Sequence, residues 1–178
     1  NGWRRQKQTH RLIATVHHMD KPVIAAVNGA ASGLGCDLAF ACDFVMGGSS
    51  ASFSMAYLKR GLIPDGGGLY FLPRRVGIAR AKELIFSART VESDEALEIG
   101  LADRIIDDGR LVTDAVAWAQ SLCSGPASAI ALSKSIINRS VDLSLETVFA
   151  LGSEAQSICY ASDEHHDAVT AFLNKSSR

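Results

Sequence analysis

Residues 21–43 read KPVIAAVNGAASGLGCDLAFACD. Val23–Val27 is a short continuous apolar run, which is typical of a strand buried on both faces of a parallel sheet. A glycine-rich segment, residues 29–35, follows it, and a short apolar helix is predicted over Cys36–Cys42. A buried strand, a tight turn and a helix in this order indicate an α/β protein.

The glycine-rich segment 29–35 resembles the dinucleotide fingerprint of short-chain dehydrogenases, in which pyrophosphate binds at a helix N-terminus. The catalytic Tyr-x-x-x-Lys of that family is absent, because no Lys stands four residues after Tyr57, Tyr70 or Tyr160. The predicted helix is also short, and no acidic residue closes a well-formed second strand. The same N–H groups could instead stabilise the enolate oxyanion of a thioester. Taken alone, the segment favours a plain tight turn.

The rest of the chain divides into a mixed part, residues 1–110, and a helical part, residues 111–178. In the mixed part, periodicity and turn signals predict strands over 44–46, 52–54 and 101–106, and helices over 5–19, 67–72, 78–87 and 94–99. Ser93 is expected to cap the last of these helices, and Gly100 to end it in a left-handed conformation. In the helical part, helices are predicted over 111–123, 127–139, 144–161 and 163–174.

Composition excludes several classes of function. The net charge of −1 argues against a nucleic-acid partner, and no apolar run approaches the length of about 18 residues that a membrane span needs. The first ten residues are polar and basic, so no signal peptide is expected, and the chain reads as the middle of something larger. The four cysteines form no CxxC pair, which indicates reduced core residues in a cytoplasmic protein. The adjacent histidine pairs, 17–18 and 165–166, cannot form a two-ligand helix face, so no metal site is predicted.

An ordered set of motifs extends the opening stretch over nearly the whole chain. It comprises 21–29, 33–39, 41–43, 51–54, 61–64, 66–68, 72–74, 76–77, 96–97, 100–102 and 168–175. This set resembles the crotonase (enoyl-CoA hydratase/isomerase) family. The resemblance implies a spiral of ββα turns in residues 1–110, without the N-terminal part of the family core, followed by C-terminal helices that build trimers or paired trimers. It also implies an acyl-CoA substrate whose coenzyme A is part of the substrate, so that no separate cofactor is needed.

The same resemblance implies the site residues. The family holds the thioester oxygen with two backbone N–H groups. The second corresponds to Leu34, where glycine is usual, and the first lies on an upstream segment that this chain lacks. The two glutamates of enoyl-CoA hydratases correspond to Asp37 and Tyr57, and a tyrosine cannot act as a carboxylate base. The remaining positions implied to contact substrate are Ala30, Gly33, Gly35, Gly66, Gly67 and Lys175.

Asp65 stands in a Pro-Asp-Gly-Gly turn where most hydratases have glycine. Family members that shift double bonds, including isomerases of phenylacetate breakdown, carry Asp there, and one carboxylate suffices to take and return a proton. We therefore favour an isomerase over a hydratase, with Asp65 as catalytic base and Asp37 either assisting it or capping its own helix.

Four alternatives to this reading of Asp65 remain. Asp65 could be a plain turn residue. It could be the nucleophile of a 4-chlorobenzoyl-CoA-type dehalogenase. The chain could be an enoyl-CoA hydratase, or a catalytically degenerate acyl-CoA-binding paralogue. A basic region could meet the CoA phosphates or form a solvated face; it comprises Lys59, Arg60, Arg74, Arg75 and Arg80.

Overall fold

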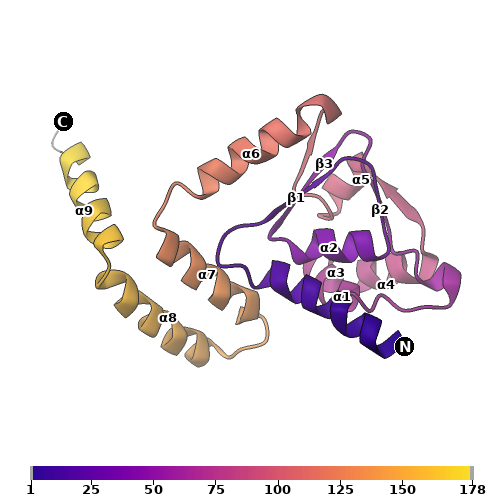
Figure 1. Ribbon diagram of the computed structural model, residues 1–178, viewed down its shortest axis with the longest axis horizontal. Coiled ribbons are helices and arrows are strands. Elements are labelled where there is room, and N and C mark those ends of the chain that lie inside the picture. The colour runs from indigo at the N-terminus through magenta and orange to yellow at the C-terminus, as the bar shows by residue number, and fades with distance from the viewer. Residues whose placement is uncertain (1, 177–178) are drawn as a thin grey trace. The chain divides into compact units, whose positions relative to one another are not determined.

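The computed structural model describes residues 2–176 and has the expected mixed α/β architecture with helices toward the C-terminus (Figure 1). Its packing divides the chain into two compact units. The first unit comprises the chain up to His18 and Val23–Ala119, and the second comprises Met19–Pro22 and the chain from Gln120 onward. The strands all belong to the first unit, as do the candidate site residues described below, apart from Lys175.

The first unit is built around two three-stranded sheets that the chain visits in turn. One sheet is parallel throughout, with the order β1 (Ile24–Val27), β3 (Phe44–Gly48) and β6 (Arg104–Ile106). The other has the order β2 (Ala30–Ser32), β4 (Ser52–Ser54) and β5 (Thr90–Glu92), in which β2 and β4 are parallel and β5 is antiparallel to β4. The chain therefore places one strand in each sheet before the next helix forms, first as β1, β2 and α2 (Leu34–Ala41), then as β3 and β4.

The helices of the first unit pack on the two sheets and on one another (Figure 1). They are α1 (Gly2–His17), α2, α3 (Gly68–Val76), α4 (Ile78–Ser87), α5 (Ser93–Glu98) and α6 (Leu111–Leu122), with short 3₁₀ turns at Leu58–Arg60 and Asp108–Arg110. The main core lies among α2, β4, α3 and α4, where Phe53 and Leu72 are fully buried. A smaller cluster joins Met46 of β3 to Leu111 of α6.

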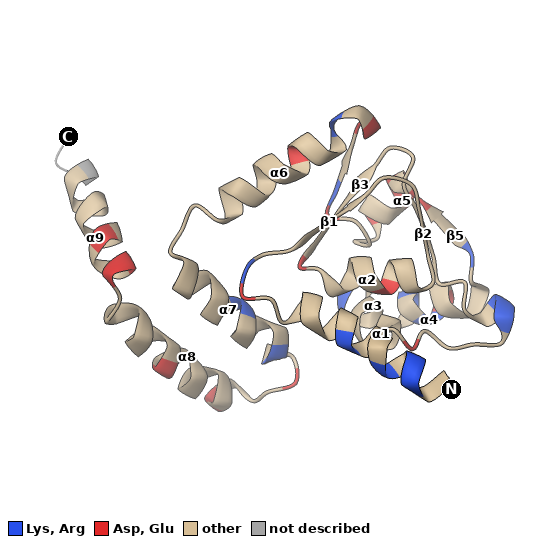
Figure 2. Ribbon diagram, viewed as in Figure 1, with Lys and Arg blue, Asp and Glu red and all other residues tan. Residues whose placement is uncertain are grey.

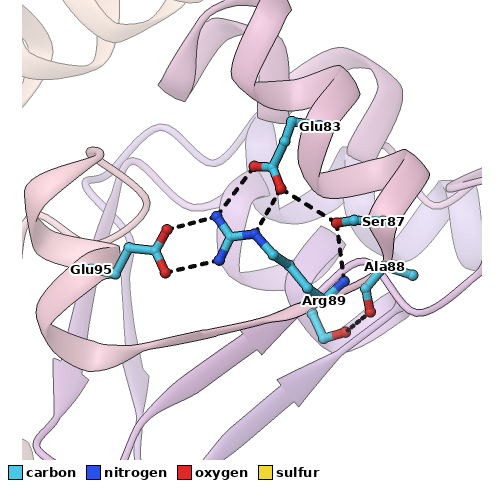
Figure 3. Close-up of polar contacts among 6 residues, drawn as sticks. Glu83, Ser87, Ala88, Arg89 and Glu95 are labelled. Atoms are coloured by element: carbon cyan, nitrogen blue, oxygen red, sulfur yellow. Dashed lines mark hydrogen bonds and ion pairs between the residues drawn. The ribbon is translucent and has the colours of Figure 1, made fainter.

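Two arginines link separate segments of the first unit by hydrogen bonds. Arg75 of α3 donates to Asp103 and to the carbonyl oxygens of Gly100 and Leu101. Arg89 extends its guanidinium between Glu83 of α4 and Glu95 of α5 and makes paired hydrogen bonds to each carboxylate (Figure 3). Arg75 and Arg89 are therefore occupied by protein partners rather than available to a ligand.

Several local predictions in the first unit need correction. Strand β1, predicted to be buried on both faces, is half-buried with Ala26 exposed. The strand predicted over 101–106 covers only Arg104–Ile106, and the helix predicted over 67–72 runs over Gly68–Val76. Ala30–Ser32, expected within a turn, forms strand β2, and β5 was not predicted. The second helix begins at Leu34 rather than Cys36, because Gly33 leaves helical geometry with φ 54° and ψ −115°. Ser93 does not cap α5; Glu92 holds that position, and the Ser93 hydroxyl donates to the carbonyl oxygen of Ser49. Gly100 is left-handed as expected, with φ 79°.

The second unit contains α7 (Ala127–Ser140), α8 (Leu145–Tyr160) and α9 (Asp163–Ser176). Glu164 of α9 accepts hydrogen bonds from the peptide N–H groups of Ala127 and Ser128, the first residues of α7, and so caps that helix with a negative charge. The α8 helix is capped by the Ser144 hydroxyl, which accepts from the Thr147 N–H.

The four cysteines were predicted to be core residues, but only one of them is fully buried. Cys36 is buried, Cys42 and Cys159 are half-buried, and Cys123 is exposed. All four are free thiols. Within residues 2–176, no helix combines the length and apolar character needed to cross a bilayer, and no cluster of His, Cys, Asp or Glu could hold a metal ion.

Candidate active site

A cavity of about 470 Å³ opens in the first unit where the start of α2 meets α1 and the segment leading into α3. The turn before α2 contributes Ser32 and Gly33, and α2 itself contributes Leu34. Ala56, Tyr57, Arg60, Leu62 and Asp65 line it from the connection between β4 and α3. Gly2, Arg5, Gln6 and Thr9 complete the wall from α1. The cavity therefore unites the two segments that the glycine-rich motifs of the sequence single out.

Leu34 is the first residue of α2, where a peptide N–H has no partner within its own helix. Gly33, directly before it, adopts a positive φ that favours glycine and donates its N–H to the carbonyl oxygen of Ser54 at 2.9 Å. This bond ties the turn to β4. Within residues 2–176, no acceptor is recorded for the Leu34 N–H, so a donor is left for a bound group at the cavity wall.

Asp65 contributes a carboxylate to the same cavity. Its oxygen Oδ2 is buried, and among the described residues it has no hydrogen-bond partner. The Asp65 main chain is held on both sides: its N–H donates to the carbonyl oxygen of Ile63 at 2.8 Å, and His10 Nε2 of α1 donates to its carbonyl oxygen at 2.9 Å. The backbone is thus fixed, while the side chain retains unused acceptor capacity.

Asp37 and Tyr57 form a buried pair beside the cavity. The Tyr57 hydroxyl donates to Asp37 Oδ2 at 2.5 Å, and Asp37 is fully buried. The other oxygen, Oδ1, has no well-aligned partner among the described residues, although the peptide N–H groups of Gly66 and Gly68 attract the carboxylate. Asp37 is absent from the cavity lining, whereas Tyr57 belongs to it. Asp37 is therefore joined to the cavity wall by its hydrogen bond with Tyr57.

Burial raises the pKa of the Asp37 carboxyl from 3.8 to about 6. The hydrogen bond from Tyr57 lowers this pKa, and the charge of Asp65 raises it. Burial and the Asp37 carboxylate together raise the pKa of the Tyr57 phenol, so it keeps its proton. Burial also raises the pKa of the neighbouring Cys36 thiol to about 12, so it stays protonated. Near neutral pH the site therefore holds a phenol and a thiol in their neutral forms beside a carboxyl that titrates.

The raised pKa of Asp37 predicts a pH dependence of stability. Between about pH 4 and pH 6 the folded protein keeps a proton that the unfolded chain has lost. The free energy of unfolding should therefore fall as pH rises through this window, by about 3 kcal/mol. Urea unfolding of the complete protein at several pH values measures this slope. We expect Asp37→Asn to remove the slope, and Tyr57→Phe to extend it above pH 6 because the hydrogen bond that lowers the pKa is lost. An unchanged slope in Asp37→Asn would contradict the assignment.

The structure brings some of the sequence-predicted residues together and separates others. Gly33, Leu34, Tyr57 and Asp65 line the cavity, and Asp37 lies behind Tyr57. Gly66 packs against Asp37, since a Cβ there would clash with Asp37 Oδ2. The predicted substrate residues that are not part of the lining are Ala30, Gly35, Gly66 and Gly67. The side chain of Lys175 lies outside the described part of the chain, so its prediction stays open.

Sequence reasoning missed the wall formed by α1, because nothing local marks Arg5, Gln6 or Thr9 as site residues. Together with Gly2 they stand at i, i+3, i+4 and i+7, the spacing of residues on one helix face. Only the packing of that face near Asp65 gives it a role, and a contact across more than fifty residues has no local signal. The hydrogen bond from His10 to Asp65 is a second contact of this kind.

Comparison with known proteins agrees with this architecture. A family model described as Enoyl-CoA hydratase/isomerase matches residues 4–178. A short-chain-enoyl-CoA hydratase of Clostridium acetobutylicum is 40% identical over 93% of this chain and 64% of its own length. A 1,2-epoxyphenylacetyl-CoA isomerase of Escherichia coli is 37% identical over 93% of this chain and 63% of its own length.

Solved structures show the same fold. The crystal structure of an enoyl-CoA hydratase/isomerase from Cupriavidus metallidurans superposes with a TM-score of 0.92 at 40% identity, over 97% of this chain and 65% of that one. An enoyl-CoA hydratase from Bacillus anthracis gives a TM-score of 0.92 at 31% identity, over 96% of this chain and 66% of that one. The chain thus spans less than two thirds of each of these relatives and has their crotonase fold throughout. It belongs to the enoyl-CoA hydratase/isomerase family.

Proposed function

We propose that this chain carries the proton-transfer site of an acyl-CoA isomerase that moves a carbon–carbon double bond. The observation that carries the proposal is that Asp65 is the only carboxylate among the described residues that line the cavity, where it faces the same space as Leu34. Double-bond migration needs a base and a donor to the thioester oxygen, and Asp65 and Leu34 supply one of each. A relative named for the isomerisation of 1,2-epoxyphenylacetyl-CoA supports the assignment.

In the proposed reaction, a 3-enoyl thioester binds with its carbonyl oxygen near the Leu34 N–H. The Asp65 carboxylate removes a proton from the carbon next to the thioester, and the electron pair moves to the carbonyl oxygen as an enolate. The N–H stabilises that charge where it develops. Asp65 then returns the proton to the fourth carbon, the double bond moves into conjugation with the thioester, and the carboxylate is regenerated. No cofactor beyond the CoA of the substrate takes part.

Hydration is the second candidate. Relatives with names of hydratases are as similar to this chain as the isomerase, and Asp37 lies near enough to Asp65 for its pKa to respond to that charge. Adding water across a double bond with paired carboxylates would require Asp37 to reach the cavity. Tyr57 lines the cavity and its hydroxyl donates to Asp37, which is not part of the lining.

The test supplies three thioesters to the complete protein. Conversion of a 3-enoyl-CoA into its conjugated isomer, without water addition to crotonyl-CoA, is the expected result. Hydration of crotonyl-CoA at the higher rate would establish the second candidate. Chloride release from 4-chlorobenzoyl-CoA would instead make Asp65 a nucleophile, and binding of all three without turnover would indicate a degenerate paralogue.

We also propose that the chain assembles as a homotrimer or a pair of trimers. Large apolar side chains are exposed along the helices of the second unit, among them Ile137, Phe149 and Phe172. Isolated soluble domains rarely expose such residues in numbers, and subunit contacts would cover them.

A further inference from the structure

The wall that α1 contributes to the cavity is polar and cationic. Arg5, Gln6 and Thr9 line the cavity from one face of this helix. Lys and Arg residues run along α1, and Figure 2 shows no acidic residue on it. Arg60, from the 3₁₀ turn after Tyr57, adds a second guanidinium to the lining.

These two guanidiniums are available to a ligand. Within residues 2–176, neither Arg5 nor Arg60 has a recorded side-chain hydrogen bond or ion pair. Arg75 and Arg89 of the same unit are both occupied by carboxylates. Asp65 is the only acid in the described lining, so two cationic groups face the cavity against one anionic group. An anion bound there would meet a positive local field.

Another part of the lining is apolar. Leu34, Leu62 and the ring of Tyr57 line the same cavity, and the two leucine side chains are 41% and 57% exposed. A purely hydrocarbon acyl chain would cover these groups but would also displace water from the guanidiniums without replacing its hydrogen bonds. A ligand with an apolar stem and an anionic end would satisfy both parts of the wall.

We infer that the preferred substrates are acyl-CoA thioesters whose acyl chain ends in a carboxylate, which Arg5 and Arg60 recognise. The inference rests on the proposed function, because it assumes that the reacting end of the thioester lies between Leu34 and Asp65. The CoA phosphates are a second source of negative charge. The two arginines line the same cavity of about 470 Å³ as the proposed reacting groups, so they lie within reach of the acyl end of a bound thioester. The acyl carboxylate is therefore the anion that these arginines meet.

The test measures binding without turnover. Saturated thioesters cannot undergo double-bond migration or hydration, so their affinity is independent of which reaction the enzyme performs. Isothermal titration calorimetry of the complete protein compares glutaryl-CoA with pentanoyl-CoA and adipyl-CoA with hexanoyl-CoA, pairs that differ only in the chain end. We expect the carboxylate-ended member to bind about five- to tenfold more tightly at low salt, and the preference to shrink as salt is added.

Variants assign the preference to its residues. Arg5→Gln and Arg60→Gln should each reduce it by about threefold, and Arg5→Lys, which keeps the charge, should retain most of it. Arg4→Gln is the matched control, since Arg4 neighbours Arg5 on α1 but is absent from the lining, and it should leave the preference unchanged. Equal weakening of both members of each pair would assign the arginines to the CoA phosphates and overturn the inference. Tighter binding of the methyl-ended thioesters to the unaltered protein would overturn it as well. Failure of the isomerase assay alone would not affect these results.

Discussion

Replacing Asp65 by Asn is expected to lower kcat for double-bond migration by about 10²- to 10⁴-fold, the range that a positioned general base contributes. Asn has nearly the shape of Asp but cannot accept a proton at neutral pH. Asp65 Oδ2 has no partner among the described residues, so the substitution breaks no recorded side-chain bond and the fold should persist. Stopped-flow absorbance of the conjugated thioester product measures kcat, and calorimetry with a saturated thioester should show binding within about threefold of the unaltered protein.

Two further substitutions are needed to interpret the loss of activity expected in Asp65→Asn. Asp94→Asn is the control, because Asp94 is exposed on α5 and away from the cavity, and kcat should change by less than about twofold. Asp37→Asn separates the two candidate functions. If one carboxylate shuttles the proton, Asp37→Asn should cost much less than Asp65→Asn. Losses of equal size would contradict a single-base isomerase and favour two carboxylates acting on water.

The sequence predicts the central strand, turn and helix well because each has a local physical signature. The apolar run at 23–27 predicts a strand, and β1 forms there, although it is half-buried rather than buried on both faces, and Gly33 permits the positive φ that starts α2. Strands β2 and β5, of three residues each, have no comparable local signature. Their pairing with β4 decides their structure, and that information lies elsewhere in the chain.

The candidate site likewise contains residues that a local sequence motif marks and residues that only the packing of the chain brings in. Asp65 and Leu34 stand in glycine-rich motifs that mark them, and the structure places both at one cavity. The bond between Asp37 and Tyr57 joins residues twenty positions apart, and nothing in either local segment predicts that a tyrosine hydroxyl would hold a buried carboxylate. The contribution of α1 is equally hidden, because its polar face reads as a solvent-exposed surface until the helix is packed against the segment around Asp65.

Replacing Leu34 by Pro tests the oxyanion donor itself. Proline has no peptide N–H, and removing one donor of this kind typically lowers kcat by about 10²- to 10³-fold. Proline is favoured at the first position of a helix, where the N–H has no helical partner, and Leu34 occupies that position in α2. Gly33 before it is not helical, so the restriction that proline places on the preceding residue is met.

Leu34→Ala is the matched control, since it removes the same side chain and keeps the N–H. Circular dichroism and urea unfolding should show both variants folded, while steady-state kinetics should show a large loss of kcat in Leu34→Pro and a small one in Leu34→Ala. A comparable loss in both would mean that the side chain, which contacts the segment around Gly66, matters through packing. Full activity in a folded Leu34→Pro protein would place the stabilised charge elsewhere. An oxyanion donor needs both its position and its hydrogen. Leu34→Pro removes the hydrogen and Leu34→Ala keeps it, while α2, which positions the donor, stays in place in both variants.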